Sequence, residues 1–563
     1  MYAMLATSDT PEGTLSTLPT PDTDDLTDTP TLKAALEGPE RDKWMSAIHA
    51  ELQNIKAEDV YDLIDPTHEP VDNLLGNKIV LRRKRGASGQ IERYKARFTA
   101  RGDHQRESID YEETFAPVVK SASIRVVFAL AATMGLLVRH LDVTAAFLNG
   151  VLKETVYMRQ PKGFEEPGKE SWVWKLKKAL YGLKQGGREW YNCIDNFFTD
   201  NLGLTRTFAD HSVYVFESDS CVLIVPLYVD DLLIAYDNED RMLFIKAALE
   251  ERFKMVDAGP ASWVLGMRVC IDRQNGTVSI DQSQYILKVL QRFGMADCKP
   301  ASTPLPEKTI LRSAPDDDIK ACSSFPYLQA LGSVMYAMLG TRPDIAYAVS
   351  TLSRYASCPG TQHVNALKHL LRYLKGTIAY GIIYSRDGGS LLACESDLEI
   401  DAKAISGYTD SDYAMDPETR RSVSGAVFLL AGGPISWSSR LQSSVSQSST
   451  EAEYVASTKA AKETIWLRRL MHDLKQDVSH PTPLFIDNRG ALLLAKNPIH
   501  HNNTKHIDVR HHYVRECVAD GSISLRPVAS ADNIADICTK PLGKVKFTLL
   551  RSLLGVVHIP QRR

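Results

Sequence analysis

The sequence lacks three features that would indicate a secreted, disulfide-bonded or membrane protein. Its nine cysteines are scattered with no CxxC pair, which argues against a disulfide framework and a cysteine zinc finger. The longest apolar run, residues 126–138, is well short of the roughly 20 residues that a membrane span requires. The first residues, MYAMLATSDTPEG, have neither the basic nor the apolar segment of a secretory signal. We therefore expect an intracellular protein without a membrane partner.

Charge is unevenly distributed along a chain that is long enough for several domains. With 563 residues, it has room for roughly three or four domains of about 150 residues each. The net charge is only −3, but residues 78–106 are strongly basic. Their basic residues are Lys78, Arg82, Arg83, Lys84, Arg85, Arg93, Lys95, Arg97, Arg101 and Arg106, against Glu92 and Asp103. Such an excess suits a phosphate-binding surface, and a solvated basic face is the alternative.

Composition and periodicity divide the chain into four parts. Residues 1–31 are rich in Thr, Pro and Asp and indicate a disordered linker or tail. Residues 32–300 mix helical spacing (43–55 and 123–138) with a strand pattern (91–102), which indicates an α+β body. Prolines break the pattern between 299 and 318, where we expect a hinge, and residues 301–395 are mostly helical. Residues 396–563 run through three strands and a long helix into alternating strands and helices, which predicts a mixed α/β domain with one sheet.

An aspartate pair separates two β-prone runs in LIVPLYVDDLLIAY, residues 223–236. Two residues between such runs is hairpin spacing and predicts that Asp230 and Asp231 occupy the turn. Aspartate is also a common turn residue, so the pair alone does not distinguish a site from a turn. Asp142 adds a third carboxylate, at the end of a predicted strand (138–143) and before a predicted helix. Ligand groups gather at such positions in α/β sheets.

Three carboxylates at neighbouring strand ends require a cation. They would repel one another and raise one another's pKa values unless a divalent ion neutralised them. Carboxylate oxygens suit Mg²⁺, which typically binds one or two protein carboxylates together with substrate phosphates. Two such ions can activate a primer 3′ hydroxyl and stabilise a pyrophosphate leaving group. Polymerase chemistry is therefore the prediction for this first set of carboxylates.

A second set of carboxylates is spread over the predicted C-terminal α/β domain. Asp410 ends its first strand, Glu453 lies on the long helix, Asp487 ends the strand PLFIDN, and Asp536 starts the last predicted helix. Each has an ordinary alternative: a turn for Asp410, a capping box with Thr450 for Glu453, and helix N-termini for the other two. Four carboxylates on one sheet favour a shared metal site over four unrelated structural roles.

Neighbouring residues leave alternatives open around this second set. Asp412, two residues along and so on the same strand face, is the main rival of Asp410, and Glu451 is a weaker rival of Glu453. Histidines also gather nearby, at His500, His501, His506, His511 and His512. A zinc site there is disfavoured because no paired-cysteine spacing accompanies them and only Cys517 lies close in sequence.

The motifs together resemble the reverse transcriptase of copia-type LTR retrotransposons. RYKARFTARG, YEETFAPV, LDVTAAFLNG, VYMRQPKGF, KALYGLKQ and YVDD occur in this order, and the likeness continues in GSVMYAMLGTRPDIAYAVSTLSRY and LRYLKGT. The resemblance covers about residues 40–300 for the polymerase and extends almost to the end of the sequence. It implies reverse transcriptase fingers and palm over residues 32–300, a mostly helical thumb or connection over 301–395, and a ribonuclease H-like α/β domain over 396–563.

The resemblance also implies roles for individual residues of the polymerase. Asp142 and Asp230 would bind both metal ions, with Asp231 completing the cluster, and Phe147 would exclude a ribose 2′ hydroxyl. The other nucleotide- and template-binding residues would be Lys95, Arg97, Tyr181 and Gly182. Of these, Lys95 and Arg97 would face the incoming triphosphate, which arginine can bind bidentately. Core packing of Phe147 and surface charge of Lys95 and Arg97 are the alternatives.

Two features depart from the family pattern. Gly186-Gly187, in LKQGGREWY, stands where an Ala-Pro pair is usual, and glycine loosens a turn that proline would fix. Pro226 lies in the strand before YVDD, where it removes a ladder donor and would fit best at an edge or a bulge. Neither change removes a metal ligand.

The segments GYTDSDYA, SSTEAEYVA, IDNRGAL and ADNIADICTK resemble copia-type ribonuclease H. The resemblance implies that Asp410, Glu453, Asp487 and Asp536 bind two ions for hydrolysis of the RNA strand of an RNA–DNA hybrid. One ion would generate the attacking hydroxide and the other would stabilise the leaving 3′ oxygen. Asp508 is an alternative fourth ligand. A basic helical face toward the hybrid phosphates is expected from Lys505, His506, Arg510 and Arg515.

The predicted function is an RNA-directed DNA polymerase with ribonuclease H activity from a copia-type retrotransposon. The expected cofactor is Mg²⁺, with two ions per active site and Mn²⁺ as the alternative ion. The expected partners are an RNA template, a DNA primer, the RNA–DNA hybrid and dNTPs, together with integrase and capsid proteins of the same element. The expected location is a cytoplasmic virus-like particle, the nucleus or both. The alternative is a decayed or host-retained fragment that only binds nucleic acid; the presence of every candidate carboxylate favours the enzyme.

Overall fold

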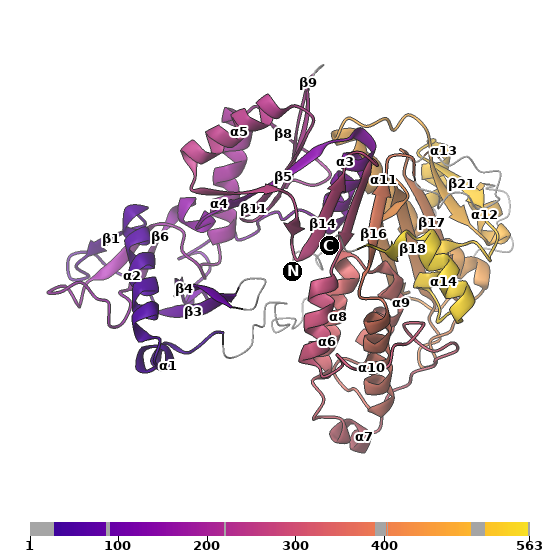
Figure 1. Cartoon of the computed structure of the whole chain (residues 1–563), viewed down its shortest axis with the longest axis horizontal. Helices are drawn as coiled ribbons and strands as arrows, with labels where there is room; N and C mark the ends of the chain where they lie inside the picture. Colours follow the sequence, from indigo (N-terminus) through magenta and orange to yellow (C-terminus); the bar gives the residue numbers. More distant parts are fainter. Residues whose placement is uncertain are drawn as a thin grey trace.

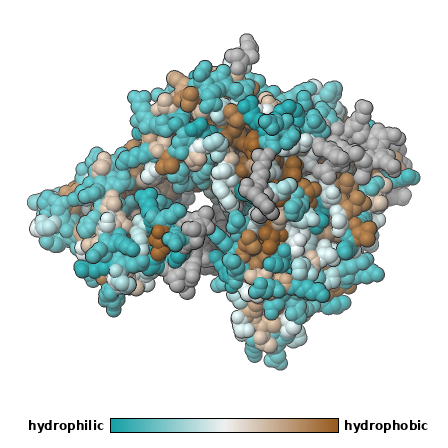
Figure 2. Space-filling model, in the orientation of Figure 1, coloured by the Kyte–Doolittle hydropathy of each residue, from teal (hydrophilic) through white to brown (hydrophobic). Residues whose placement is uncertain are grey.

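The computed structural model describes residues 28–85, 90–218, 221–388, 401, 403–496 and 513–560. Only the last four residues of the predicted tail, residues 1–31, fall within these ranges. Helices and sheets are mixed throughout, so the predicted α+β and α/β character is confirmed. Across the same ranges, no helix has both the length and the apolar content needed to cross a membrane. On the face shown in Figure 2, hydrophilic residues predominate and hydrophobic ones form scattered groups.

The N-terminal body, at the left of Figure 1, packs one long helix against a hairpin and a small sheet. Its elements are α1 (Leu32–Glu37), α2 (Arg41–Ala57), β1 (Tyr61–Ile64), β2 (Leu74–Leu75), β3 (Asn77–Arg85), β4 (Ile91–Ala100), η2 (Gly102–His104), β6 (Val151–Arg159) and β7 (Val173–Lys178). Helix α2 buries Trp44, Ile48 and Ile55, a spacing typical of an amphipathic helix. The basic segment forms the antiparallel hairpin β3–β4, and the sheet has the order β1-β7-β6-β2.

The second body is a six-stranded sheet of order β12-β5-β11-β10-β9-β8 with helices on both faces. Its elements are α3 (Ser121–Met134), β5 (Leu137–Val143), η3 (Ala146–Asn149), α4 (Gly186–Asn196), η4 (Phe197–Asn201), β8 (Thr205–Arg206), β9 (Val213–Ser218), β10 (Cys221–Tyr228), β11 (Asp231–Tyr236), α5 (Glu239–Arg252) and β12 (Met255–Pro260). Leu233 of β11 shares a core with α3, whereas its neighbour Ile234 shares one with α4 and α5. The period of two thus sends alternate side chains to opposite faces.

Three expectations for this sheet are corrected by the structure. Tyr228 pairs with Asp231, so the hairpin turn consists of Val229 and Asp230, and Asp231 is the first residue of β11. The helix expected after Asp142 is the short 3₁₀ helix η3. Pro226 lies in β10, a central strand rather than an edge. It pairs with β9, while the ladder toward β11 is interrupted at this point, which accommodates the missing N–H.

A third sheet combines strands from three distant parts of the chain, in the order β13-β14-β15-β16-β22. Its strands are β13 (Trp263–Val264), β14 (Met267–Asp272), β15 (Thr277–Asp281), β16 (Tyr380–Ser385) and β22 (Val556–His558). The neighbouring helices are α6 (Ser283–Arg292), α7 (Asp316–Ala321), α8 (Tyr327–Gly340), η5 (Pro343–Ile345), α9 (Ala346–Ser353) and α10 (Thr361–Gly376). The predicted hinge region contains no helix or strand before α7 begins.

The C-terminal sheet has the order β19-β18-β17-β20-β21, antiparallel among its first three strands and parallel from β17 onward. Its elements are β17 (Ser406–Ser411), β18 (Val423–Leu430), β19 (Gly433–Leu441), α11 (Ser449–Asp473), β20 (Thr482–Ile486), α12 (Arg489–Lys496), α13 (Tyr513–Ala519), β21 (Ile523–Pro527), η9 (Ile534–Cys538) and α14 (Lys544–Leu553). The predicted order of three strands and a long helix is confirmed. The last predicted helix is the 3₁₀ helix η9, and α14 and β22 follow it unpredicted.

Buried contacts join α3 and its sheet to the C-terminal part. Arg125 of α3 donates from Nε to the carbonyl of Ile435 at 2.8 Å, and its guanidinium lies 3.9 Å from the centre of the Trp437 ring. Trp466 of α11 donates from Nε1 to the carbonyl of Ala209 at 2.8 Å. One hydrophobic core includes residues of α3, the six-stranded sheet and α11. The second body and the C-terminal domain are therefore packed together.

Candidate active sites: two carboxylate clusters

Strand pairing brings the first set of carboxylates to one end of the six-stranded sheet. Asp142 of β5 is the antiparallel partner of Asp231 of β11. The Val143 amide donates to the carbonyl of Asp230 at 2.9 Å, which fixes the hairpin turn against β5. The three predicted metal ligands therefore lie on adjacent backbone positions although Asp230 is 88 positions after Asp142 in the sequence.

Trp190 of α4 supports the turn that carries Asp230, a role that the sequence did not reveal. Its indole Nε1 donates to the carbonyl of Val229 at 2.6 Å, and the side chain is 1% exposed. Val229 has φ +57°, a conformation that is unfavourable for a β-branched residue. A hydrogen bond from a buried side chain helps to hold this strained turn in place. The only available signal was a valine at a hairpin position that favours glycine.

The electrostatics of the first cluster suit a cation. The pKa of Asp142 is raised by burial and by the nearby Asp231 carboxylate, and the pKa of Asp230 is raised by the same two causes. His140, two residues before Asp142, has Nε2 2.9 Å from Oδ1 of Asp231. Half-buried carboxylates with raised pKa values are stabilised as anions when a divalent ion binds.

The predicted nucleotide-binding side chains, two of which lie on β4 of the hairpin β3–β4, are close to one another and to the first cluster. The guanidinium of Arg97 is 4.7 Å from the centre of the Tyr181 ring, and Phe147 meets Tyr181 edge-to-face at 5.5 Å. The charges of Lys95 and Arg97 act on Asp142 and lower its pKa, opposing the larger effect of burial. Glu51 of α2, which the sequence did not single out, also faces this group, since its charge acts on Lys95.

Two glycine positions in KALYGLKQGG differ in what they tolerate. Gly182 has φ +91°, and a Cβ there would lie 2.3 Å from the carbonyl oxygen of Ala100, so only glycine allows this close approach of backbones. Gly187 lies in the first turn of α4, where a Cβ would make ordinary contacts with Ala116 at 3.7 Å and Phe147 at 3.9 Å. Alanine therefore fits at position 187 but not at position 182.

The second set of carboxylates contains a tight group of three. Ligand oxygens of Asp410, Glu453 and Asp487 all lie within 4.8 Å of one another, the one such group among the described residues. Asp410 lies on β17, Glu453 on α11, and Asp487 directly after β20. The parallel pairing of β17 with β20, with Tyr408 opposite Phe485, carries both strands toward this point.

This group has the properties expected of a divalent-cation site. Burial and the neighbouring Asp410 and Asp487 raise the pKa of Glu453 strongly, and burial raises the pKa of Asp410. Glu453 is 6% exposed, and its Oε2 has no hydrogen-bond partner among the described residues. An unpartnered carboxylate oxygen that is buried beside two other carboxylates fits a bound metal ion.

The other candidates for this site have different surroundings. Asp536, on η9, forms ion pairs with Lys540 at 2.6 Å and with Lys546, and it is not in the group of three. Asp412 is 4% exposed, and burial raises its pKa to about 6. Asp412 is also outside the group of three.

The N-cap of α11 corrects one sequence alternative. The helix N-cap is Ser448, whose side chain accepts from the Glu451 amide at 3.2 Å, and Glu451 accepts from the Gln447 amide at 2.7 Å. The alternative capping pair of Thr450 and Glu453 is therefore wrong. Glu451 is engaged at the helix start, which leaves Glu453 in the carboxylate group.

The predicted basic face for the hybrid falls mostly outside the described residues. Lys505, His506 and Arg510, the alternative ligand Asp508 and the five histidines of the segment all lie there. Arg515 is described, and its Nη2 donates to the carbonyl of Leu494 at 3.1 Å. This contact joins α13 to α12.

Comparisons with known proteins identify the family of the chain. A family model described as reverse transcriptase (RNA-dependent DNA polymerase) matches residues 58–307. The chain is 39% identical to the retrovirus-related Pol polyprotein from transposon TNT 1-94 of Nicotiana tabacum, over 93% of this chain and 39% of that protein. It is 30% identical to a transposon Ty5-1 protein of Saccharomyces cerevisiae, over 57% of this chain and the whole of that protein.

The chain spans about two fifths of the length of the tobacco polyprotein. Among solved structures, it is similar to the foamy viral protease-reverse transcriptase in complex with RNA/DNA hybrid. The TM-score is 0.45 and the identity 11%, over 86% of this chain and 53% of that chain.

Proposed function

The chain belongs to the reverse transcriptases of copia-type retrotransposon Pol polyproteins, and on that premise we propose that it is an RNA-directed DNA polymerase with a ribonuclease H site. The observation that carries the polymerase proposal is the pairing of Asp142 with Asp231 beside the Asp230 turn, where the charges of Lys95 and Arg97 of the hairpin β3–β4 act on Asp142. This arrangement provides anionic ligands for a metal and cationic partners for a triphosphate within one site.

The residues of the first cluster have distinct roles in this proposal. Asp142 and Asp230 would hold the divalent ions, which supply charge stabilisation for nucleotidyl transfer when bound. Lys95 and Arg97 bind the triphosphate, and the contact of Arg97 with the Tyr181 ring orients its guanidinium. Phe147 packs edge-to-face on Tyr181 and limits the space at the sugar, which favours dNTPs over ribonucleotides.

Primer extension on an RNA template with Mg²⁺ and dNTPs tests the polymerase proposal. Asp230→Asn should reduce extension to background, because the turn loses an anionic ligand. Asp240→Asn, an exposed aspartate in the first turn of α5, is the matched control and should retain wild-type extension. If the wild-type protein extends no primer where a related enzyme does, the alternative of a decayed fragment that only binds nucleic acid is favoured instead.

A second activity, hydrolysis of the RNA strand of a hybrid, is supported by a separate observation. Asp410, Glu453 and Asp487 form a buried carboxylate group with one unpartnered oxygen. These three residues would hold the divalent ion or ions that supply a nucleophilic hydroxide, and Asp536 is the candidate fourth ligand. Asp487→Asn should abolish cleavage of a labelled hybrid and leave primer extension intact. Equal loss of both activities would contradict two independent sites.

The same proposal extends to the domains and partners. We assign residues 32–300 to the fingers and palm, residues 301–395 to a thumb or connection, and residues 396–563 to the ribonuclease H-like domain. The RNA template, DNA primer and RNA–DNA hybrid would bind along the surfaces that join the two sites. Integrase and capsid proteins of the same element are the proposed protein partners, in virus-like particles or the nucleus.

A further inference from the structure

Three positively charged side chains gather at one edge of the C-terminal sheet. Arg440 lies near the end of β19, which is the edge strand, and Lys459 and Lys462 lie on α11. All three residues are exposed. Together they form what we call the basic edge.

Two hydrogen bonds hold β19 and α11 side by side in opposite directions. Gln442, directly after β19, donates from Nε2 to the carbonyl of Ala452 at 2.9 Å, and Ser436 donates from Oγ to Oε1 of Glu463 at 2.6 Å. Side chains alternate along a strand, so Arg440 is on the same face of β19 as Ser436 and Gln442. Arg440 therefore lies on the face of β19 toward α11.

Lys459 occupies the helix position opposite Arg440. It follows Ala452 by seven residues and precedes Glu463 by four, so all three lie on one face of α11. The pKa of the Lys459 amino group is lowered by partial burial and by the positive charges of Arg440 and Lys462. The three cations are therefore close enough to repel one another.

The basic edge has no counter-charge in the part of the chain that the structure describes. None of its residues forms an ion pair or a side-chain hydrogen bond there. Glu463, four residues after Lys459, is at a spacing where ion pairs form on helices. It instead accepts the bond from Ser436, and its charge acts on the buried Arg125. Three cations that repel one another and have no anion nearby fit a surface that binds a polyanion.

The basic edge begins close to the second carboxylate cluster. Arg440 lies two strands away from Ser411 in one row of paired residues, and Ser411 follows Asp410. Neighbouring strands are about 4.8 Å apart, so this separation is about 10 Å. Lys459 lies about 9 Å along the helix from Glu453. A nucleic-acid strand advances about 3.4 Å per nucleotide, so a hybrid held at the cluster would present phosphates about three nucleotides away to the basic edge.

Beyond the basic edge, α11 continues to the body that carries the first cluster. Its Trp466 contacts the second body through the carbonyl of Ala209. The amino group of Lys120, the N-cap residue of α3, lies 4.2 Å from the centre of the Trp466 ring. In Figure 1, α3 and α11 lie next to each other, and they share one hydrophobic core. Positive charge therefore follows α11 from the second cluster toward the polymerase part of the chain.

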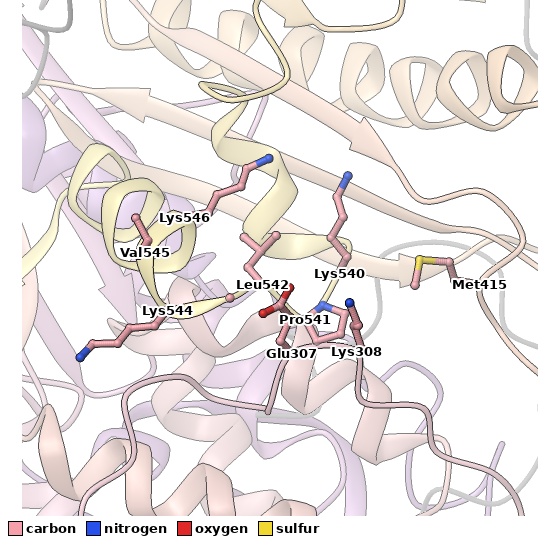
Figure 3. A pocket seen from close by; sticks show the side chains of 10 residues that line it. Glu307, Lys308, Met415, Lys540, Pro541, Leu542, Lys544, Val545 and Lys546 are labelled. Atoms are coloured by element: carbon pink, nitrogen blue, oxygen red, sulfur yellow. The ribbon is translucent and has the colours of Figure 1, made fainter.

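Another lysine-rich region differs from the basic edge in its ion pairs. It is a cavity of about 480 Å³ whose lining includes four lysines, shown in Figure 3. Lys540 lies 3.4 Å from Oδ2 of Asp410 and 2.6 Å from Oδ1 of Asp536, and Lys546 also pairs with Asp536. Two of the four cations in this cavity are therefore already paired with carboxylates.

We propose that Arg440, Lys459 and Lys462 bind backbone phosphates of the RNA–DNA hybrid, about three nucleotides from the cleaved bond and on the side toward the polymerase site. The inference rests on the proposed ribonuclease H function of the second cluster. Contacts with phosphates position a duplex without reading its sequence. The basic edge thus contributes to the affinity and register of the hybrid and not to the chemical step.

The salt dependence of hybrid binding tests the inference. Binding of a fluorescent RNA–DNA hybrid to the full chain is measured by anisotropy in EDTA, where no divalent ion supports cleavage or competes for phosphate. The triple variant Arg440→Gln/Lys459→Gln/Lys462→Gln should bind more weakly. Its slope of log K against log salt concentration should be shallower by about 2–3, because each phosphate contact contributes about 0.9.

Two control variants separate phosphate contacts from net charge and from folding. The matched control replaces three other exposed lysines by glutamine, Lys33, Lys320 and Lys475, and removes the same charge. Its slope should match that of the wild type. Exchange of arginine and lysine at the three positions of the basic edge keeps the charge and should also keep the slope. Circular dichroism verifies the fold of each variant.

Neutral methylphosphonates at single positions of the hybrid locate the contact. The cleavage position is mapped separately with Mg²⁺. In the wild type, a methylphosphonate about three nucleotides from that position, on the polymerase side, should weaken binding severalfold. The triple variant should lose this sensitivity at the same positions, because the partner cations are gone.

The possible failures are distinguishable. Equal slopes for the wild type and the triple variant overturn the inference, and so does an equal loss of slope in the matched control. A wild-type scan without a sensitive phosphate on the polymerase side overturns it even if the triple variant does not fold. Both results leave the ribonuclease H proposal standing. If the wild type cleaves no hybrid with Mg²⁺, the ribonuclease H proposal fails and the inference fails with it.

Discussion

Substitution of Trp190 by phenylalanine tests how far the turn that carries Asp230 depends on one buried hydrogen bond. The change removes the indole N–H that lies 2.6 Å from the Val229 carbonyl but retains an aromatic ring against Phe253. A buried carbonyl left without its donor costs about 1–3 kcal/mol. If this cost falls on the working position of Asp230, nucleotide incorporation slows by about 5- to 150-fold.

The assay is single-nucleotide incorporation at saturating dNTP and primer–template, with the affinity for primer–template measured separately. Trp190→Phe should lower kcat and leave the affinity within about twofold, since Trp190 contacts the turn from within the protein. Trp174→Phe is the matched control: Trp174 is similarly buried, at 2% exposed, but lies on β7 against Tyr61. A kcat for Trp190→Phe within twofold of wild type, with the fold intact, would refute the proposed dependence.

Three other predictions concern the energetics of the fold. Asp344→Asn removes the ion-pair partner of Arg342; the two side chains are 0% exposed and lie 2.8 Å apart. The free energy of unfolding, measured by urea denaturation, should fall by about 3–5 kcal/mol. The apolar double variant Arg342→Met/Asp344→Leu should recover most of this loss. The Asp412 carboxyl has a folded pKa of about 6, raised above its unfolded value by burial, so its contribution to stability is fully present below about pH 4 and is lost as the pH rises through 6. Asp412→Asn should remove this slope and stabilise the metal-free protein by about 3 kcal/mol at pH 7; an unchanged stability–pH curve in EDTA would contradict the assignment. Gly187→Ala should stabilise α4 by about 0.4–1 kcal/mol, measured by native-state hydrogen exchange, because the added methyl group contacts Ala116 and Phe147 without a clash. Gly203 has φ +66°, so Gly203→Ala is the contrasting variant and should destabilise the turn at that position.

Local sequence patterns predicted a helix or strand well wherever the element buries a single face of apolar side chains. The periodicity of α2 and α3, the hairpin β10–β11 and the order of strands around α11 follow from the side chains that each element buries. The turn of the hairpin was misplaced by one residue because alternation defines the two runs but not where their pairing starts. The N-cap of α11 was misassigned because SSTEAE, residues 448–453, contains two overlapping matches to the capping pattern, Ser448 with Glu451 and Thr450 with Glu453.

Contacts between distant residues could not be predicted from the sequence. The bond from Trp190 to Val229 and the bridge of Lys540 between Asp410 and Asp536 depend on tertiary packing, which no local pattern encodes. The assembly of Asp410, Glu453 and Asp487 was predicted only as a set on one sheet; the parallel register of β17 with β20 determines which carboxylates meet. The central position of Pro226 was also unexpected, since the compensating gap in the ladder is a property of the partner strand.

The third sheet has a consequence for the synthesis of the chain. Strand β16 is an edge strand until β22 pairs with it, and the roughly 170 residues between them take roughly 10 to 35 seconds to translate at about 5–20 residues per second. Throughout that interval the backbone groups of Tyr380 to Ile382 remain open to pairing with another nascent chain. Neighbouring ribosomes on one message would hold such edges close together, so correct assembly depends on shielding β16 until the last strand has emerged.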